Sequence, residues 1–272
     1  MRYQVFMDYK TIRVERDSRG LLTVTLNRPD IRNAFNEVMI KELRAAFEVE
    51  AVDPGVKVIL LKGEGPVFCA GGDLNWMKKA VTYNYEENLR DTSALTKMFS
   101  ILNECPRPVI GAVHGAAIGG GVGLVSVCDM VVATAETQFS LSEVRLGIVP
   151  SCIGPFVLAK IGASQARSLF ISAERFQSDF ALSIGLIHKV VKGREELDSE
   201  VSRLIKNILL CGPNAVAVAK RLVLDLSWPE HRAMNHDCLD YVAKTLADLR
   251  VSPEGREGIT AFLEKRKPSW ML

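Results

Sequence analysis

An uncharged stretch of twenty residues, VIGAVHGAAIGGGVGLVSVC at positions 109–128, constrains the fold more than any other part of the sequence. A run of this length and composition can cross a membrane, and its glycines repeat the G-x-x-x-G spacing of membrane helix dimers. However, it opens with β-branched residues after two prolines, as a buried strand does. His114 and the glycines at 119–121 interrupt any single helix. The run therefore predicts a buried strand, a turn and a short buried helix, and no membrane span.

Strand-like and helix-like segments alternate through the first part of the chain. Alternating and continuous apolar runs predict strands, and apolar spacing of three and four predicts helices. The predicted strands cover 11–29 (two strands joined by DSRG), 56–65 with turn residues at its end, and 130–141, and the predicted helices cover 36–53 and 85–104. Such alternation implies crossover connections between mostly parallel strands, which is the pattern of an α/β fold.

The sequence becomes mainly helical after about residue 155, where only 186–192 resembles a strand. Ser252 and Pro253 are typical of the start of a final helix. We therefore predict a core over residues 1–195 and a helical region over 196–272, which packs on the core or on a neighbouring subunit.

Charge and cysteine content exclude several classes of protein. The net charge is +2, with 34 basic and 32 acidic residues, so no strong field attracts nucleic acid or an anionic membrane. The six cysteines form no C-x-x-C pair, and the four histidines form no metal motif with them. We expect reduced thiols, no metal site and a cytoplasmic location, because the N-terminus lacks an apolar signal-peptide segment.

Two glycine-bearing loops follow predicted buried strands. Gly71 and Gly72 come after strand 56–65, and the triple glycine 119–121 comes after the strand that starts at 109. If these strands are neighbours, both loops open at the same sheet edge and offer unpaired N–H groups, as an oxyanion hole does. The run matches neither a Walker A loop nor G-x-G-x-x-G, because Leu124 stands where the second pattern needs glycine. Two purely structural turns remain the alternative.

A glutamate after a predicted strand limits the reactions that such an oxyanion hole could serve. The chain has no G-x-S-x-G elbow, and His114 lies in a predicted buried strand, where a core role is expected. Chemistry that combines enolate stabilisation with one acid or base remains. Glu143, in QFSLSEVRLGIVPS, can supply that group if partial burial raises its pKa; the alternative is an ordinary surface glutamate.

Several motifs in the same order resemble the enoyl-CoA hydratase/isomerase (crotonase) family: LNRPDIRNAFN, FCAGGDLNWM, AVHGAAIGGGVGL, CDMVVATAETQFSLSEVRLGIVP and AFLEKR. Their wording is nearest to hydratases that act on methylglutaconyl- or isohexenylglutaconyl-type CoA esters. The resemblance implies a spiral of β-β-α units with a helical C-terminal trimerisation region, assembled as a trimer or a dimer of trimers. It implies an acyl-CoA substrate, of which coenzyme A is a part, and no separate cofactor.

The resemblance also assigns roles to individual positions. It makes Gly72 and Gly120 the oxyanion donors and Glu143 the proton-transfer group. Ser151 stands where many hydratases have a glycine whose N–H holds water. The coenzyme A path would be lined by Arg32, Ala34, Ala70, Asp73 and Leu74, with Phe262 and Lys265 reaching it across a subunit boundary. The chain departs from the family pattern at Gly123, where hydratases carry a first glutamate.

A hydratase that adds water across the 2,3 double bond with Glu143 alone is the first reading of this pattern. A Δ3,Δ2-enoyl-CoA isomerase also needs only one carboxylate. A non-catalytic binder of CoA esters or of RNA is a third reading, although the near-neutral charge argues against RNA. Arg145 is the candidate cation for a carboxylated acyl group. Candidate walls of the acyl pocket, or plain core residues, are Trp76, Met77, Leu141, Cys152, Ile153 and Phe156.

Overall fold

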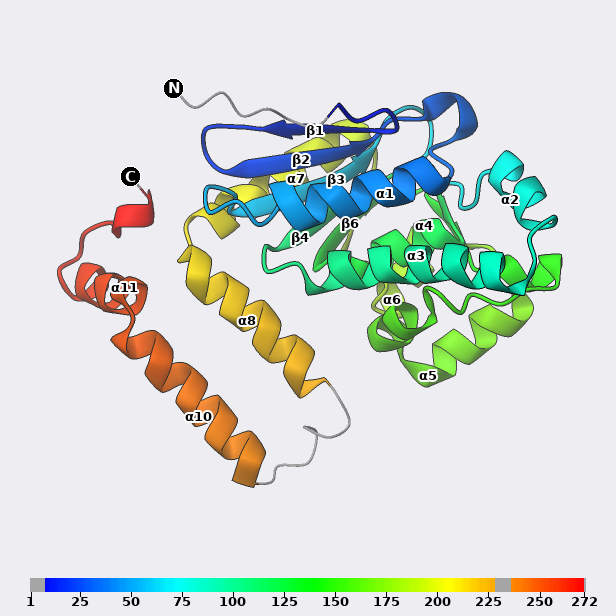
Figure 1. Cartoon of the computed structure of the whole chain (residues 1–272). Helices are drawn as coiled ribbons and strands as arrows, with labels where there is room; N and C mark the ends of the chain where they lie inside the picture. The colour runs from blue at the N-terminus through cyan, green and yellow to red at the C-terminus, as the bar shows by residue number, and fades with distance from the viewer. Residues whose placement is uncertain (1–7, 228–235, 272) are drawn as a thin grey trace.

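The computed structural model describes residues 8–227 and 236–271, whose strands form two sheets (Figure 1). The larger sheet has the order β1-β2-β3-β4-β6-β9, and all its neighbours are parallel except the β1–β2 hairpin. The smaller sheet has the order β5-β7-β8. The strands of the large sheet are β1 (Ile12–Arg16), β2 (Leu21–Leu26), β3 (Val58–Gly63), β4 (Val109–Val113), β6 (Met130–Thr134) and β9 (Lys189–Val191). Those of the small sheet are β5 (Ala116–Ile118), β7 (Gln138–Ser140) and β8 (Phe176–Gln177).

The chain visits the two sheets in turn and then enters a helix, and this unit repeats. β4 lies in the large sheet, β5 in the small one, and α4 (Gly120–Val127) follows. β6, β7 and α5 (Gly154–Ser172) repeat the order, with the 3₁₀ turn η3 (Glu143–Leu146) before α5. After β3, Cys69 makes an isolated bridge to Ala117 of β5 before α2 (Leu74–Ala80) and α3 (Tyr85–Glu104). The predicted α/β spiral of β-β-α units is confirmed.

One predicted strand is wrong in an informative way. The segment 130–141 is not a single strand, because a turn at 135–137 divides it into β6 and β7, which belong to different sheets. Thr134 and Thr137 share a side-chain hydrogen bond of 2.8 Å across this turn. The short polar stretch 135–138, in which Ala135 and Glu136 are exposed, marks the break in the sequence, but it is too short to show that the two strands belong to different sheets.

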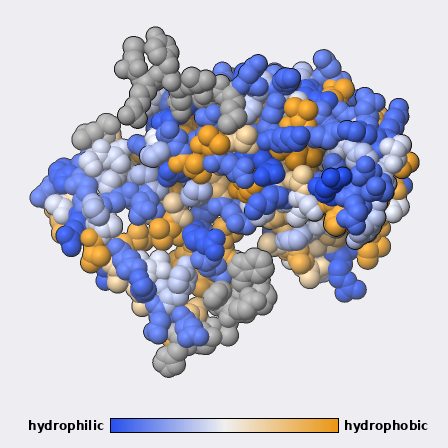
Figure 2. All heavy atoms as spheres, in the orientation of Figure 1, coloured by the Kyte–Doolittle hydropathy of each residue, from blue (hydrophilic) through white to orange (hydrophobic). Residues whose placement is uncertain are grey.

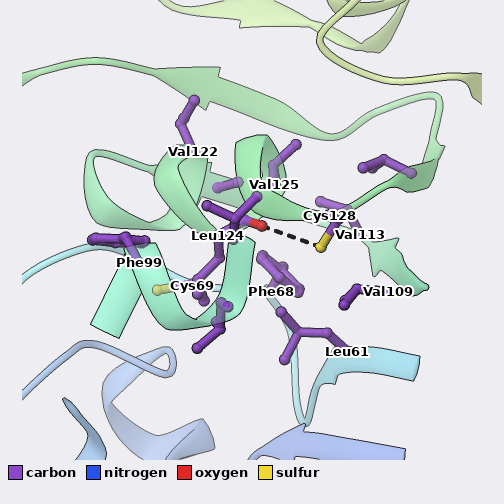
Figure 3. Packing of buried hydrophobic residues seen from close by; sticks show 14 of the residues in the cluster. Leu61, Phe68, Cys69, Phe99, Val109, Val113, Val122, Leu124, Val125 and Cys128 are labelled. Carbon is purple, nitrogen blue, oxygen red and sulfur yellow. Dashed lines mark hydrogen bonds between the residues drawn. The ribbon is translucent and has the colours of Figure 1, made fainter. Parts of the chain in front are cut away.

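The glycine-rich run 109–128 forms β4, β5 and α4, as the strand, turn and helix prediction required. Every residue of α4 after Gly120 is buried. Figure 3 shows Phe68, Cys69 and Phe99 packed around this helix, and a hydrogen bond of 3.1 Å between Cys128 Sγ and the Leu124 carbonyl. In the described part of the chain no single helix is long and apolar enough for a membrane crossing, although two consecutive helices bent by 105° pass together on length and composition.

Helices cover both faces of the large sheet. α1 (Glu37–Ala45), the π-helical turn η2 (Ala46–Glu50), α3 and α4 pack on one apolar face, and α7 (Arg194–Leu209) packs on the other. α6 (Ser178–Ser183) precedes β9, and 3₁₀ turns cover Pro29–Ile31 (η1) and Ser269–Met271 (η4). The predicted division after residue 195 stays a prediction, and α7, which it assigns to the second region, lies against the sheet.

Three helices at the C-terminal end extend away from the sheets (Figure 1). They are α8 (Pro213–Leu226), which the sequence patterns did not single out, α10 (His236–Val251) and α11 (Pro253–Leu263). A salt bridge of 2.8 Å from Lys220 Nζ to Asp129 Oδ2 holds α8 to the core. Ser252 caps α11 as predicted, since its side chain accepts a hydrogen bond from the Gly255 amide. Figure 2 shows mostly hydrophilic residues on one face, with apolar residues in separate patches, some of them over these helices.

Candidate active site

The two glycine loops lie side by side. Their strands, β3 and β4, are parallel neighbours, so both loops leave the same sheet edge. Beyond the sheet, the Cys69 amide donates to the Ala116 carbonyl and the Ile118 amide to the Cys69 carbonyl, each at 3.0 Å. The isolated parallel bridge between Cys69 and Ala117 thus holds the start of one loop against the start of the other. The predicted convergence of the two loops is therefore present in the structure.

The backbones approach so closely that side chains are excluded. A Cβ atom on Gly121 would lie 2.5 Å from the Cys69 carbonyl oxygen, and one on Gly71 would lie 2.9 Å from that of Ile118. Gly71 also has a φ of +92°, which L side chains rarely adopt. The glycines in these loops thus serve the contact between the loops, besides any contact with a ligand.

Phe35 links the two candidate oxyanion donors. Its amide donates to the Gly71 carbonyl (2.7 Å) and its carbonyl accepts from the Asp73 amide (2.8 Å), an arrangement that turns the Gly72 N–H to the opposite side. The Phe35 ring lies under Gly120, where a Cβ atom would be 2.9 Å from Cε2. Gly120 opens α4 and has no intrahelical acceptor. Within the described chain, neither of the two glycine amides donates a hydrogen bond to a protein acceptor.

The Glu143 carboxyl lies beside this pair. β7 is parallel to β5, and the Gly119 amide donates to the Ser140 carbonyl at 2.8 Å, so Glu143 leaves the small sheet next to the glycine run. A Cβ atom on Gly119 would lie 3.0 Å from Glu143 Oε1. Oε2 is buried without a hydrogen-bond partner. Burial raises the pKa of Glu143, and a backbone hydrogen bond opposes the shift only in part. The carboxyl is therefore partly buried, as its predicted role requires, and is not an ordinary surface charge.

Two residues that the sequence analysis missed hold the first loop in place. Arg28 Nη2 pairs with Asp73 Oδ2 at 2.8 Å, and its Nη1 donates to the Ala34 carbonyl at 2.7 Å. The buried Asn33 side chain accepts from the Arg28 amide and donates to the carbonyls of Glu64 and Val67. Both residues lie within the motif LNRPDIRNAFN, which pointed to the family without revealing what these side chains bind.

Asp73 has a structural task in this loop. It caps α2, with Oδ1 accepting from the Asn75 amide at 2.7 Å. Burial by itself would raise the pKa of this carboxyl, but the hydrogen bonds from Asn75 and Arg28 outweigh it and hold the pKa below its ordinary value. Its side chain is therefore occupied, which leaves the backbone for the predicted contact with coenzyme A.

The structure brings most of the predicted coenzyme A residues together. The Ala70 amide donates to the Arg32 carbonyl at 2.9 Å, Ala34 is buried beside them, and Leu74 is 74% exposed at the start of α2. Phe262 and Lys265 lie at the far end of the subunit, on and just after α11 (Figure 1). One subunit does not bring them to the glycine loops, so their predicted role across a subunit boundary stays a prediction.

The surroundings of Glu143 are apolar where a hydratase of the family would carry its first glutamate. A Cβ atom on Gly123 would lie 2.3 Å from Ile153 Cγ2 and 2.8 Å from Phe99 Cε1. The amide of Ser151, which stands where many hydratases have the glycine whose N–H holds water, donates to the Val149 carbonyl at 2.8 Å. Core side chains thus fill the place of the first glutamate, and the amide at the water-holding position is hydrogen-bonded within the protein.

The remaining candidate pocket residues divide into two groups. Met77 Sδ and Trp76 Cε3 would be 3.4 and 3.8 Å from a Cβ atom on Gly72, so both border the donor loop. Leu141 is buried, Phe156 packs on Phe99, and the Cys152 thiol contacts the Thr92 carbonyl. The Arg145 guanidinium donates to the Ala173 carbonyl at 3.0 Å, which directs it to the end of α5. No three His, Cys, Asp or Glu side chains of the described residues gather as a metal site.

Known proteins resemble the chain over nearly its full length. Residues 16–271 match the family described as enoyl-CoA hydratase/isomerase. A crotonyl-CoA hydratase of Syntrophomonas wolfei is 33% identical over 269 residues, covering 97% of this chain and 99% of the relative. A trans-2-decenoyl-[acyl-carrier-protein] isomerase of Streptococcus mutans is 30% identical with the same coverage. The crystal structure of an enoyl-CoA hydratase from Shewanella pealeana superposes with a TM-score of 0.92 at 36% identity, covering 97% of each chain. The chain belongs to the enoyl-CoA hydratase/isomerase family.

Proposed function

We propose that the protein is an enoyl-CoA hydratase that adds water across the 2,3 double bond of an acyl-CoA thioester. One observation carries the proposal: the buried Glu143 carboxyl lies against Gly119, directly beside the unpaired Gly120 amide and the neighbouring Gly72 amide. A relative that is 33% identical is named as a crotonyl-CoA hydratase, which supports the same reaction.

The reaction follows from this geometry. The thioester oxygen accepts hydrogen bonds from the Gly72 and Gly120 amides, which stabilise the negative charge that develops on it. Glu143, as a carboxylate, takes a proton from water while the water oxygen bonds to C3. The resulting enolate then takes that proton back at C2 from the same face. Burial raises the pKa of Glu143, which makes its carboxylate a stronger base for the first transfer and keeps the acid able to return the proton.

A Δ3,Δ2-enoyl-CoA isomerase is the second candidate. Ile153 and Phe99 fill the space at Gly123, and the Ser151 amide is engaged, so the site lacks two groups that could position water. Isomerisation needs no water: one carboxylate removes a proton from C2 and returns it at C4 through the same stabilised enolate. The relative from Streptococcus mutans is named as an isomerase.

We further propose a trimer or a dimer of trimers that works in the cytoplasm without a cofactor beyond the coenzyme A of its substrate. Phe262 and Leu263 on α11 are 82% and 72% exposed, which favours a covering subunit. The cysteines of the described residues are free thiols, as in a reducing compartment. A net charge of +2 favours no nucleic-acid partner. Methylglutaconyl-type esters remain candidate substrates, although Arg145 is directed to Ala173.

The proposal is tested by running the reaction in water labelled with heavy oxygen and measuring whether the product takes up the label. The enzyme is incubated with crotonyl-CoA, methylglutaconyl-CoA and a 3-enoyl-CoA, and the products are examined by mass spectrometry. Incorporation of one labelled oxygen into a 2-enoyl substrate is the expected result. Unlabelled conversion of the 3-enoyl ester to its 2-enoyl isomer, without hydration, would replace the hydratase with the isomerase. Binding without turnover of any ester would leave the non-catalytic reading.

A further inference from the structure

Trp76 connects the oxyanion loop to a carboxylate that the mechanism does not use. One edge of its ring, Cε3, lies 3.8 Å from the position of a Cβ atom on Gly72. At the other edge, the indole Nε1–H donates to Asp91 Oδ1 of α3 at 3.1 Å. The side chain therefore spans the distance from the donor glycine to α3.

The helix that carries Trp76 depends on such contacts because its packing is weak. No side chain of α2 is fully buried. Lys79 Nζ forms an ion pair of 2.6 Å with Glu37 Oε1, but Lys79 is 59% exposed, so the pair contributes little to rigidity. The half-buried indole packs against the core and is fixed by the bond to Asp91. Both contacts end on a carboxylate, but the bond to Asp91 is part-buried, whereas the Lys79–Glu37 pair is exposed to solvent and screened by it.

Asp91 has surroundings that an incidental surface carboxylate would lack. It lies at the edge of a groove of 340 Å³ between α1 and α3, where Glu37, Arg90 and Glu87 also face the solvent. Desolvation raises its pKa, the Trp76 hydrogen bond opposes the shift, the charge of Glu37 adds to it, and the charge of Lys79 opposes it. A partly desolvated charge that bonds an indole N–H gives the ring one orientation, in which its other edge borders the loop at Gly72.

We propose that Asp91 is a positioning residue, which orients the Trp76 ring and thereby holds the Gly72 amide in place for the thioester oxygen. The inference rests on the proposed function only in taking Gly72 as an oxyanion donor, which hydration and isomerisation share. Asp91 itself touches neither water nor the acyl group in this scheme.

The test compares Asp91→Ala, Asp91→Asn, Trp76→Phe and the Asp91→Ala/Trp76→Phe double variant in the full-length protein. Asn keeps an oxygen acceptor for the indole, and Phe keeps most of the ring but loses the donor. Lys79→Gln breaks the other contact of α2 and is the matched control. Two readouts are used: kcat and KM with crotonyl-CoA, and the ultraviolet absorbance of the enolate of bound acetoacetyl-CoA, which reports the oxyanion donors without turnover.

We expect Asp91→Ala and Trp76→Phe each to lower kcat about tenfold, equivalent to about 1.4 kcal/mol, with KM within about twofold of wild type. The double variant should lose no more than either single variant, whereas Asp91→Asn and Lys79→Gln should stay within about twofold. The bound enolate signal should weaken in the same three variants. Equal thermal melting midpoints in Trp76→Phe and wild type would separate the effect from global unfolding.

Additive losses in the double variant, or equal losses in Asp91→Asn and Asp91→Ala, would overturn the inference. If wild type forms the bound enolate but hydrates no ester, the hydratase proposal fails, and the enolate signal of the variants still decides the role of Asp91. If wild type forms no bound enolate, the donor role of Gly72 is lost and the inference falls with it.

Discussion

Gly123 and Ile153 are packed so tightly that a Cβ atom on Gly123 would stand 2.3 Å from Ile153 Cγ2. Position 123 therefore lacks room for any side chain, because neighbouring core residues fill the space that a glutamate would need. Phe99, at 2.8 Å from the same position, closes it from α3. The single-glutamate chemistry proposed for this protein is thus built into the packing of α3, α4 and α5.

Gly123→Ala should lower the free energy of unfolding by about 1–3 kcal/mol, since the added methyl group overpacks the core. Urea denaturation measures the change. Gly154→Ala is the matched control, because a Cβ atom there meets only Phe170 Cε2 at an ordinary 3.7 Å. The loss in Gly123→Ala/Ile153→Ala should be smaller than the sum of the losses in the two single variants, because truncation of Ile153 relieves the clash. A Gly123→Ala protein as stable as Gly154→Ala would contradict the close contact.

The Gly72 amide can be tested by a pair of substitutions that differ in one N–H group. Gly72→Pro removes the donor and should lower kcat about 10²- to 10³-fold. Gly72→Ala keeps the donor, and its Cβ atom would make ordinary contacts with Met77 and Trp76, so kcat should stay within about threefold. Steady-state kinetics measures both. Similar losses in the two variants would mean that bulk at position 72, not the amide, limits turnover.

Glu143→Gln should lower kcat about 10²- to 10⁴-fold, the range of general acid–base catalysis, and leave CoA-ester binding largely intact. In the wild type the working form is the carboxylate, and its pKa is raised by burial. Activity should therefore fall as pH decreases through a pKa above the ordinary 4.5. The pH profile of kcat/KM measures this acid limb. Turnover by Glu143→Gln close to wild type would remove Glu143 from the mechanism.

Glu143→Gln, which should lower activity, should also make the folded protein more stable at high pH. The pKa of Glu143 is raised in the folded state, so the folded protein binds this proton more tightly than the unfolded chain does. The resulting contribution to the free energy of unfolding is present below the ordinary pKa of 4.5 and is lost as pH rises through the folded value. At about pH 8 the wild type holds a buried charge that Gln lacks, so Glu143→Gln should melt at least about 2 °C higher. The difference should vanish near pH 4.5. Calorimetry at the two pH values measures it, and a variant that melts lower at pH 8 would contradict the burial of the charge.

Phe262→Asp should dissociate the proposed trimer, because it places a charge on an apolar surface that a second subunit would cover. Light scattering after size-exclusion chromatography measures the mass. Thr260→Asp is the control on the same helix, since Thr260 is exposed and polar. A wild-type monomer, or a Phe262→Asp protein with unchanged mass, would contradict the assembly.

The sequence motifs around the glycine loops predicted much of the architecture. Apolar runs predicted β3 and β4, and the glycines marked where these strands end, so a shared sheet edge could be anticipated. The position of Glu143 after an apolar strand was equally visible in the sequence. These features are local, because strand and helix periods are written in neighbouring residues.

Contacts between distant segments were decided only by the tertiary structure. The bridge between Cys69 and Ala117, which brings the two glycine loops together, joins residues 48 positions apart. The Arg28–Asp73 and Trp76–Asp91 contacts, and the break between β6 and β7, also depend on which elements become neighbours. The sequence alone determined the family, the alternation of strands and helices, and the residues able to do the chemistry. The tertiary structure decided which of them meet, because hydrogen-bond register and side-chain packing join segments whose separation along the chain carries no periodic signal.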